Sequence, residues 1–372
     1  MNATSPRTTW NEFVQALHAP IDQDFNPFYW IYRLGIVVLD SIIPCRSHER
    51  RQKMNLFLRW LRPVIPAVGI MLTGLCGWSY FSIFRYTVVR TRWCGAEKAS
   101  DEEFTCHWES AHSCLVLFFI VNVIGQYLWC IFRSPGVVSA VSETDNRGMN
   151  SSESDHLNQQ SSTIMYHPDP YPTYCRMCEL RRPARAHHCR VCNKCILQYD
   201  HHCPWVNNCI GYNNYRSFVL LIFYLMAGCT YGVFILGHDF YEMMNRRIEL
   251  YGWSIRGAVH GTGLLDLPLP WVLWREYQSN GYIDHDVVLR AAFPLMLLVG
   301  VFMYSFLGYH LKIIIYGFTT LEHASRPRND AIVNPFDNGP RNNLKQVLGT
   351  SCVRLLLPLS FRPPDHFSKP RT

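Results

Sequence analysis

The chain has 372 residues, of which 48% are hydrophobic and 17% are charged, and its formal net charge is +7. The charged share is below the roughly one quarter usual for soluble domains, and the composition excludes a disordered chain, a collagen-like chain and a small disulfide scaffold. The modest positive charge suits a membrane surface or an anionic ligand better than a dedicated nucleic-acid binder.

The N-terminal region, 1–63, begins with polar residues and carries no signal-peptide pattern. Within it, the stretch from Tyr29 to Ile43 is apolar but contains Arg33 and Asp40. A segment of about 15 residues is too short to span a bilayer, so we expect it to lie at the membrane interface or to pack against the helices.

Four apolar stretches are long enough to cross a membrane: 64–84, 113–132, 218–237 and 291–316. Lys and Arg are in excess before the first stretch, between the second and third, and after the fourth, but not in the other two loops. By the positive-inside rule, both termini and the insert between spans two and three face the cytosol. The prediction is an α-helical membrane protein with four transmembrane helices and a cytosolic cysteine-rich insert. No internal repeat is apparent.

We expect six regions along the chain. A polar linker rich in Ser, Asn, Asp, Glu and Gln separates the second span from the insert, and this composition is typical of disorder. The regions are a cytosolic N-terminal region (1–63), spans one and two with a luminal loop (64–133), the linker (134–165), the cysteine-rich domain (166–217), spans three and four with a luminal loop (218–318), and a cytosolic tail (319–372).

Seven of the 15 cysteines fall between Cys175 and Cys209. The pattern is Cys-x2-Cys-x8-His-His-Cys-x2-Cys-x2-Cys-x4-Asp-His-His-Cys-x5-Cys. The two Cys-x2-Cys pairs favour zinc over a redox dithiol, and the insert has few aliphatic residues with which to fold without metal. Its seven Cys and four His exceed the eight ligands that two tetrahedral zinc ions take. The surplus indicates chemistry beyond a structural role.

Two runs carry a family resemblance: Arg182-Pro-Ala-Arg-Ala-His-His-Cys and Asp200-His-His-Cys-Pro-Trp-Val-Asn-Asn-Cys-Ile-Gly. They resemble the DHHC family of protein S-acyltransferases, and the four-span layout agrees. The resemblance implies an irregular, β-hairpin domain that binds two structural Zn²⁺ ions in an interleaved pattern. The implied ligands are Cys175, Cys178, His188 and Cys195 for the first ion, and Cys189, Cys192, His202 and Cys209 for the second.

The same resemblance implies ping-pong chemistry, in which Cys203 takes a long-chain acyl group from an acyl-CoA such as palmitoyl-CoA. His201 would act as the base, Asp200 would hold His201, and a membrane-proximal cysteine of a substrate protein would accept the acyl group. A thiol beside an imidazole and a carboxylate is the general arrangement for nucleophilic catalysis. Five basic residues are expected either to meet CoA phosphates or to meet lipid headgroups and solvent: Arg181, Arg182, Arg185, Arg190 and Lys194.

After span four, Thr319-Thr-Leu-Glu322 resembles the family's Thr-Thr-x-Glu motif, which implies a brace for the catalytic module; a helix N-cap explains the same residues equally well. Asn343 matches a tail residue that packs back near the helices. The Phe28-Tyr29-Trp30 segment and the long second luminal loop resemble one branch of this family, whose members reside in the endoplasmic reticulum and Golgi.

The alternative to an enzyme is a catalytically silent membrane zinc module, either a scaffold or a RING-like recruiter of partners. A nucleic-acid partner is not expected, because the chain lacks a basic aromatic platform. Whether Cys94 and Cys106 form a luminal disulfide stays open at this point.

Overall fold

The computed structural model describes residues 63–81, 84–85, 89, 107–138, 173–251, 278, 285–325 and 334–350, all within one compact unit. The predicted interfacial segment, residues 139–165 of the predicted linker, and Cys94 and Cys106 lie outside the described residues.

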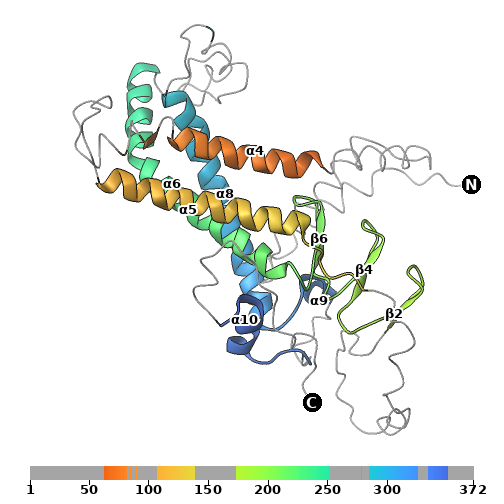
Figure 1. The fold of residues 1–372 in the computed structure, drawn as a ribbon. Helices are drawn as coiled ribbons and strands as arrows, with labels where there is room; N and C mark the ends of the chain where they lie inside the picture. The colour runs from red at the N-terminus through yellow and green to blue at the C-terminus, as the bar shows by residue number, and fades with distance from the viewer. Residues whose placement is uncertain are drawn as a thin grey trace, which may run out of the picture. The chain divides into compact units, whose positions relative to one another are not determined.

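Four apolar helices carry the fold: α4 (Val64–Ser79), α5 (His107–Phe132), α6 (Tyr215–Tyr251) and α8 (His285–Ile315) (Figure 1). By length and composition, α5, α6 and α8 could cross a membrane, which fits an integral membrane protein. Helix α4 begins where the first span is predicted, but its 16 residues are short for a full crossing, so this fourth span stays a prediction.

Helices α6 and α8 reach further than the apolar stretches that predicted them. Helix α6 has 37 residues and continues to Tyr251, and α8 already begins at His285. At 1.5 Å per residue α6 is about 55 Å long, well beyond the roughly 30 Å hydrocarbon core of a bilayer. Hydropathy detects only the lipid-facing part of such a helix, so the predicted loop 238–290 begins and ends in helix.

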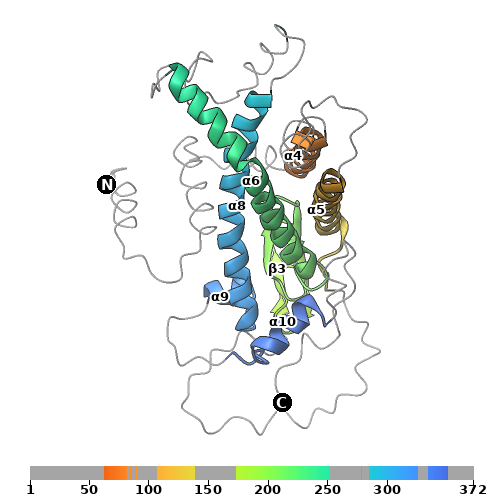
Figure 2. The same cartoon turned by 90° about the vertical axis from the view of Figure 1, so that its left-hand side faces the viewer.

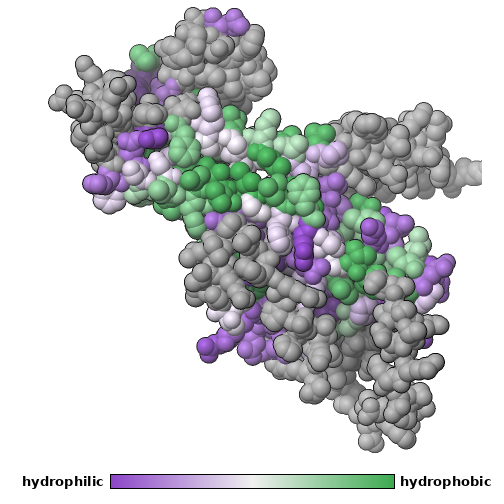
Figure 3. Space-filling view, viewed as in Figure 1, coloured by the Kyte–Doolittle hydropathy of each residue, from purple (hydrophilic) through white to green (hydrophobic). Residues whose placement is uncertain are grey.

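The helices pack in sequence, α4 on α5, α5 on α6 and α6 on α8, and α6 crosses α8 at an angle (Figure 2). Helix α6 packs closely on α8 at Gly232, where an added Cβ would lie 2.5 Å from the Met296 sulfur. The outer faces are apolar, as on Met71 and Trp78 of α4, and Figure 3 shows an apolar band across the helices.

Between α5 and α6 the chain forms three antiparallel two-stranded β-hairpins, as the resemblance implied. Their bounds are β1 (Thr173–Cys175) with β2 (Leu180–Arg182), β3 (His187–Cys189) with β4 (Lys194–Ile196), and β5 (His201–Cys203) with β6 (Asn208–Ile210). The second hairpin buries mainly cysteines around Ile196. Strands of three residues with so little aliphatic packing need a further source of stability.

Two short helices follow α8 on the same side as the hairpins: α9 (Thr320–Ser325) and α10 (Pro340–Leu348). Helix α10 packs on α8. The side-chain amide of Asn343 donates to the carbonyl of Ile315 at 2.8 Å and to Asp337 at 2.7 Å. The tail therefore folds back onto the end of α8, as expected for Asn343.

Candidate active site and metal clusters

The first metal cluster joins hairpins one and two. Cys175 ends β1, Cys178 lies in the turn after it, and the strand pair β3–β4 places His188 directly opposite Cys195. Nδ1 of His188 lies 3.2 Å from the Cys178 sulfur, 3.6 Å from Cys175 and 3.9 Å from Cys195. Ligands around a tetrahedral zinc ion stand about 3.6 Å apart, so this cluster fits zinc.

The second cluster repeats this arrangement one hairpin later, with Cys189 and Cys192 from hairpin two and His202 opposite Cys209 in hairpin three. Nδ1 of His202 lies 3.5 Å from Cys192, 3.6 Å from Cys209 and 3.9 Å from Cys189. Hydrogen bonds from Cys209 and His202 lower the pKa of Cys192 to about 4, which favours the thiolate that zinc binds. Each cluster could hold a metal ion, and their interleaving agrees with the resemblance.

Removing metal is expected to unfold the hairpins, because in such small domains the binding free energy of structural zinc is folding free energy. Limited proteolysis after chelation, read by mass spectrometry, should show new cleavage within 173–210 while the helices stay protected. Added Zn²⁺ should restore protection. A hairpin region that stays protected after complete loss of zinc would contradict this expectation.

The side chains of strand β5 alternate between two faces, and only one of these faces contributes a ligand to the second metal cluster. Residues two apart on a strand share a face. His201 and Cys203 therefore face away from the second metal cluster, toward which His202 points. Cys203 is 5% exposed and belongs to neither cluster.

His201 lies between a carboxylate and a thiol. Its Nδ1 is 2.7 Å from Oδ2 of Asp200, which leaves the other ring nitrogen for its hydrogen bond with Cys203. Burial disfavours the charged ring, whereas the hydrogen bonds to Asp200 and Cys203 raise the pKa of His201 to about 10. An imidazolium stabilises a neighbouring thiolate, so the pair is suited to nucleophilic attack.

Asp200 is held by Thr320, the first residue of α9. Its Oδ1 accepts the Thr320 backbone N–H at 2.7 Å, and its Oδ2 accepts the Thr320 hydroxyl at 2.8 Å. Burial opposes ionisation of Asp200, but the hydrogen bond from His201 and that ring's charge hold the pKa of the carboxyl below its usual value. The carboxylate is therefore ionised and fixed in the orientation that positions His201.

The Thr319–Glu322 motif both caps helix α9 and braces the hairpins. The Glu322 carboxylate accepts the Thr319 N–H at 2.8 Å, and the Thr319 hydroxyl accepts the Glu322 N–H at 3.2 Å, which is a capping box for α9. Glu322 also accepts two hydrogen bonds from the Arg185 guanidinium, at 2.8 and 2.7 Å. The motif thus ties the hairpins to the end of α8.

Arg185 requires a correction. It is buried, its guanidinium is engaged by Glu322 and by the Gly317 carbonyl at 2.9 Å, and it lies 4.6 Å above the ring of Phe336. A guanidinium enclosed in this way cannot meet a CoA phosphate. The other four basic candidates remain at the surface: Arg182 is half-buried, and Arg181, Arg190 and Lys194 are exposed.

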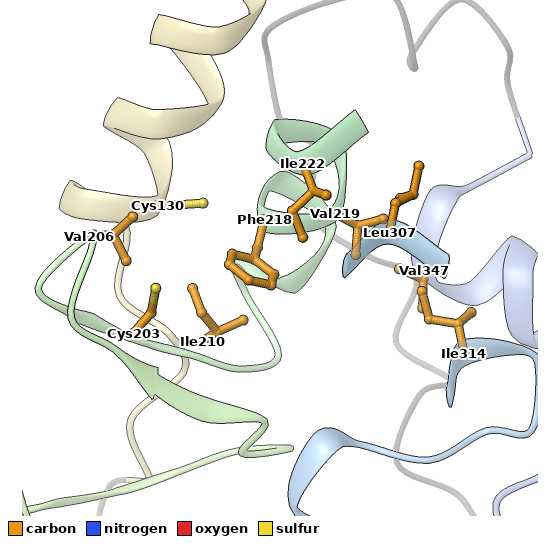
Figure 4. Packing of buried hydrophobic residues seen from close by; sticks show 10 residues of the cluster. All are labelled: Cys130, Cys203, Val206, Ile210, Phe218, Val219, Ile222, Leu307, Ile314 and Val347. Atoms are coloured by element: carbon orange, nitrogen blue, oxygen red, sulfur yellow. The ribbon is translucent and has the colours of Figure 1, made fainter. Parts of the chain in front are cut away.

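Cys203 belongs to an apolar cluster of buried side chains. In Figure 4, Cys130 of α5 and Val206 lie beside Cys203, with Ile210 and Phe218 next to them. An apolar wall at this thiol suits an alkyl chain better than a polar group.

Sequence reasoning missed three residues behind the site: Tyr215, Phe218 and His310. His310 of α8 is 1% exposed, and its Nδ1 lies 3.1 Å from the Tyr215 hydroxyl. The Phe218 ring packs edge-on against both His201 and His310, with centroids 5.1 and 5.2 Å away. The available signal was an ionisable residue inside an apolar helix.

Comparisons with known proteins agree with this geometry. Residues 169–327 match the family model of the DHHC palmitoyltransferase. The palmitoyltransferase ZDHHC15 of Xenopus laevis is 34% identical over 199 residues, which are 53% of this chain and 49% of that protein. The probable protein S-acyltransferase 12 of Arabidopsis thaliana is 26% identical over 294 residues, covering 78% and 85% of the two chains.

The palmitoyltransferase ZDHHC6 of Homo sapiens is 33% identical over 194 residues, which are 49% of this chain and 45% of that protein. The chain thus spans about half the length of several of these curated relatives. The matched region contains all three hairpins, α6, α8 and α9. The identification made from the sequence is confirmed: residues 169–327 form a domain of the DHHC palmitoyltransferase family.

Proposed function

We propose that this chain is a membrane protein S-acyltransferase that moves a long-chain acyl group, such as palmitoyl, from acyl-CoA to cysteines of substrate proteins. The observation that carries the proposal is a thiol outside both metal clusters, hydrogen-bonded to an imidazole that a buried carboxylate orients. Structural zinc alone gives no reason for Cys203, His201 and Asp200 to be arranged in this way.

In the first half-reaction the Cys203 thiolate attacks the thioester carbonyl of the acyl-CoA. The new bond joins the Cys203 sulfur to the acyl carbon, and the bond from that carbon to the CoA sulfur breaks. The His201 imidazolium gives its proton to the departing CoA thiolate, which leaves a neutral imidazole beside an acylated Cys203. Asp200 keeps the ring oriented throughout.

In the second half-reaction the neutral His201 imidazole takes the proton of a substrate cysteine thiol. That sulfur attacks the acyl carbon, and the Cys203 thioester breaks. The enzyme is left with a Cys203 thiolate beside a His201 imidazolium, as at the start. No oxidant or reductant is needed, because one thioester replaces another at each step.

The rest of the site supports this chemistry. When bound, two zinc ions would hold the hairpins through their eight Cys and His ligands, with no open position for substrate. Arg181, Arg182, Arg190 and Lys194 are the candidates for CoA phosphates. A cytosolic active site would keep the CoA headgroup in water while the acyl chain enters the apolar cluster. An endoplasmic reticulum or Golgi membrane is the proposed location.

A catalytically silent scaffold or RING-like recruiter is the second candidate. It would need the metal clusters and the surface of the hairpins, but not an oriented imidazole beside a free thiol.

The proposal is tested with the purified full-length chain in detergent, incubated with labelled palmitoyl-CoA as wild type and as Cys203→Ser. We expect label on the wild type that hydroxylamine removes, and none on the variant. No label on zinc-replete, folded wild type would overturn the enzyme proposal in favour of the scaffold. Equal label on both proteins would place the nucleophile on another thiol.

A further inference from the structure

The three hairpins are copies of one unit spaced by 14 residues, which corrects the expectation of no internal repeat. Cys175, Cys189 and Cys203 are each the last residue of the first strand in their hairpin. Each pairs with the first residue of the returning strand. The nucleophile therefore occupies the position of a metal ligand.

The turns repeat as well. Glu179, Asn193 and Asn207 have φ values of 52°, 53° and 49°, and each immediately precedes the returning strand. A left-handed residue at the same place in all three turns means that the backbone folds the same way after each cysteine. The difference between the hairpins lies in their side chains.

Metal binding follows a simple rule across the repeat. A hairpin supplies two cysteines three residues apart, and the next hairpin supplies a His and a Cys from facing strand positions. The second cysteine of the pair is Cys178 in hairpin one and Cys192 in hairpin two. In hairpin three this position is Val206, and no fourth hairpin follows, because α6 begins at Tyr215.

We propose that the third hairpin is half of a zinc site, and that Val206 is the residue that keeps the Cys203 thiol free of metal. This specificity role rests on the proposed function of Cys203. Val206 is 1% exposed and packs in the apolar cluster with Cys130, Ile210 and Phe218. At the position where hairpins one and two have the second cysteine of their pair, Val206 has two methyl groups and no metal ligand.

One further donor would give the three protein ligands with which zinc can bind when water fills its fourth position. Cys203 and His201 lie two residues apart on the same face of β5, and imidazole and thiolate are both good zinc ligands. A thiol at position 206 would add a third donor with the spacing that both metal clusters use. The structure therefore predicts that Val206→Cys converts the active site into an inhibitory metal site.

The test compares Val206→Cys with Val206→Ser, a matched variant of nearly equal size that lacks a soft ligand. Both full-length proteins are purified under reducing conditions with Zn²⁺, and bound zinc per chain is measured by elemental analysis. We expect V206C to hold about one more zinc ion than V206S. Added Zn²⁺ should suppress Cys203 acylation by at least about tenfold in V206C. In V206S the ratio of acylation without added Zn²⁺ to acylation with it should stay near one.

Equal zinc content in the two variants would overturn the inference, whatever their activity. If neither protein nor the wild type acylates, the proposed function fails while the metal count still decides the role of Val206. Should V206C lose the zinc of its first two sites, Val206→His supplies the same missing donor and is judged by the same count.

Discussion

Replacing Asp200 with Asn is expected to slow acylation of Cys203 by about 10³- to 10⁴-fold, the loss typical when the carboxylate behind a catalytic histidine becomes an amide. Asp200 accepts hydrogen bonds from His201 and from two Thr320 donors. An amide offers one oxygen and an N–H₂ group, so it cannot satisfy all three donors. It also removes the negative charge that favours the His201 imidazolium.

The measurement is the rate of acyl-enzyme formation at saturating palmitoyl-CoA, with zinc content measured in parallel. Asp286→Asn is the matched control, because that carboxylate lies on α8 near Arg246, 3.7 Å away, and outside the site. We expect the control to keep the wild-type rate. An Asp200→Asn protein with full zinc content and a rate within about threefold of wild type would contradict the role given to Asp200.

Glu322→Gln is expected to lower stability by about 3–5 kcal/mol, because it leaves the Arg185 guanidinium buried without its counter-charge. The Arg185 and Glu322 side chains are 4% and 2% exposed, so solvent cannot compensate for the lost carboxylate. The pair joins the segment between β2 and β3 to α9, and its loss should also loosen the Thr320 contacts with Asp200.

The stability is measured as the thermal midpoint for protease sensitivity of the hairpin region in detergent. The double variant Arg185→Met with Glu322→Leu removes both charges and keeps similar volume, so it should regain most of the lost stability. A double variant no more stable than Glu322→Gln would show that lost packing or capping, and not an uncompensated charge, causes the effect.

The sequence predicted the cysteine-rich insert, its position between two apolar helices and the unusual surplus of ligands. It could not give the interleaving of the metal clusters, because Cys and His spacing is compatible with several pairings. The resemblance supplied that pairing, and the register of His188 with Cys195 and of His202 with Cys209 provides its physical basis.

The local sequence could not predict which polar side chains are buried. Arg185 looks like its basic neighbours in the sequence, and only the fold places Glu322, which lies 137 residues later, against it. The role of Thr320 depends on the same long-range contact with Asp200. Helix α6 continues past its apolar stretch, because polar residues such as Asp239 can stay helical once outside the membrane.

The central claim is that one thiol carries the acyl group between two substrates. It is tested most directly with acyl-enzyme isolated free of acyl-CoA and then mixed with a membrane-anchored peptide that bears a single cysteine. The account predicts that label leaves Cys203 and appears on the peptide cysteine at the same rate, and that His201→Ala stops the transfer. A peptide that stays unlabelled until acyl-CoA is added back, with Cys203 still acylated, would contradict it.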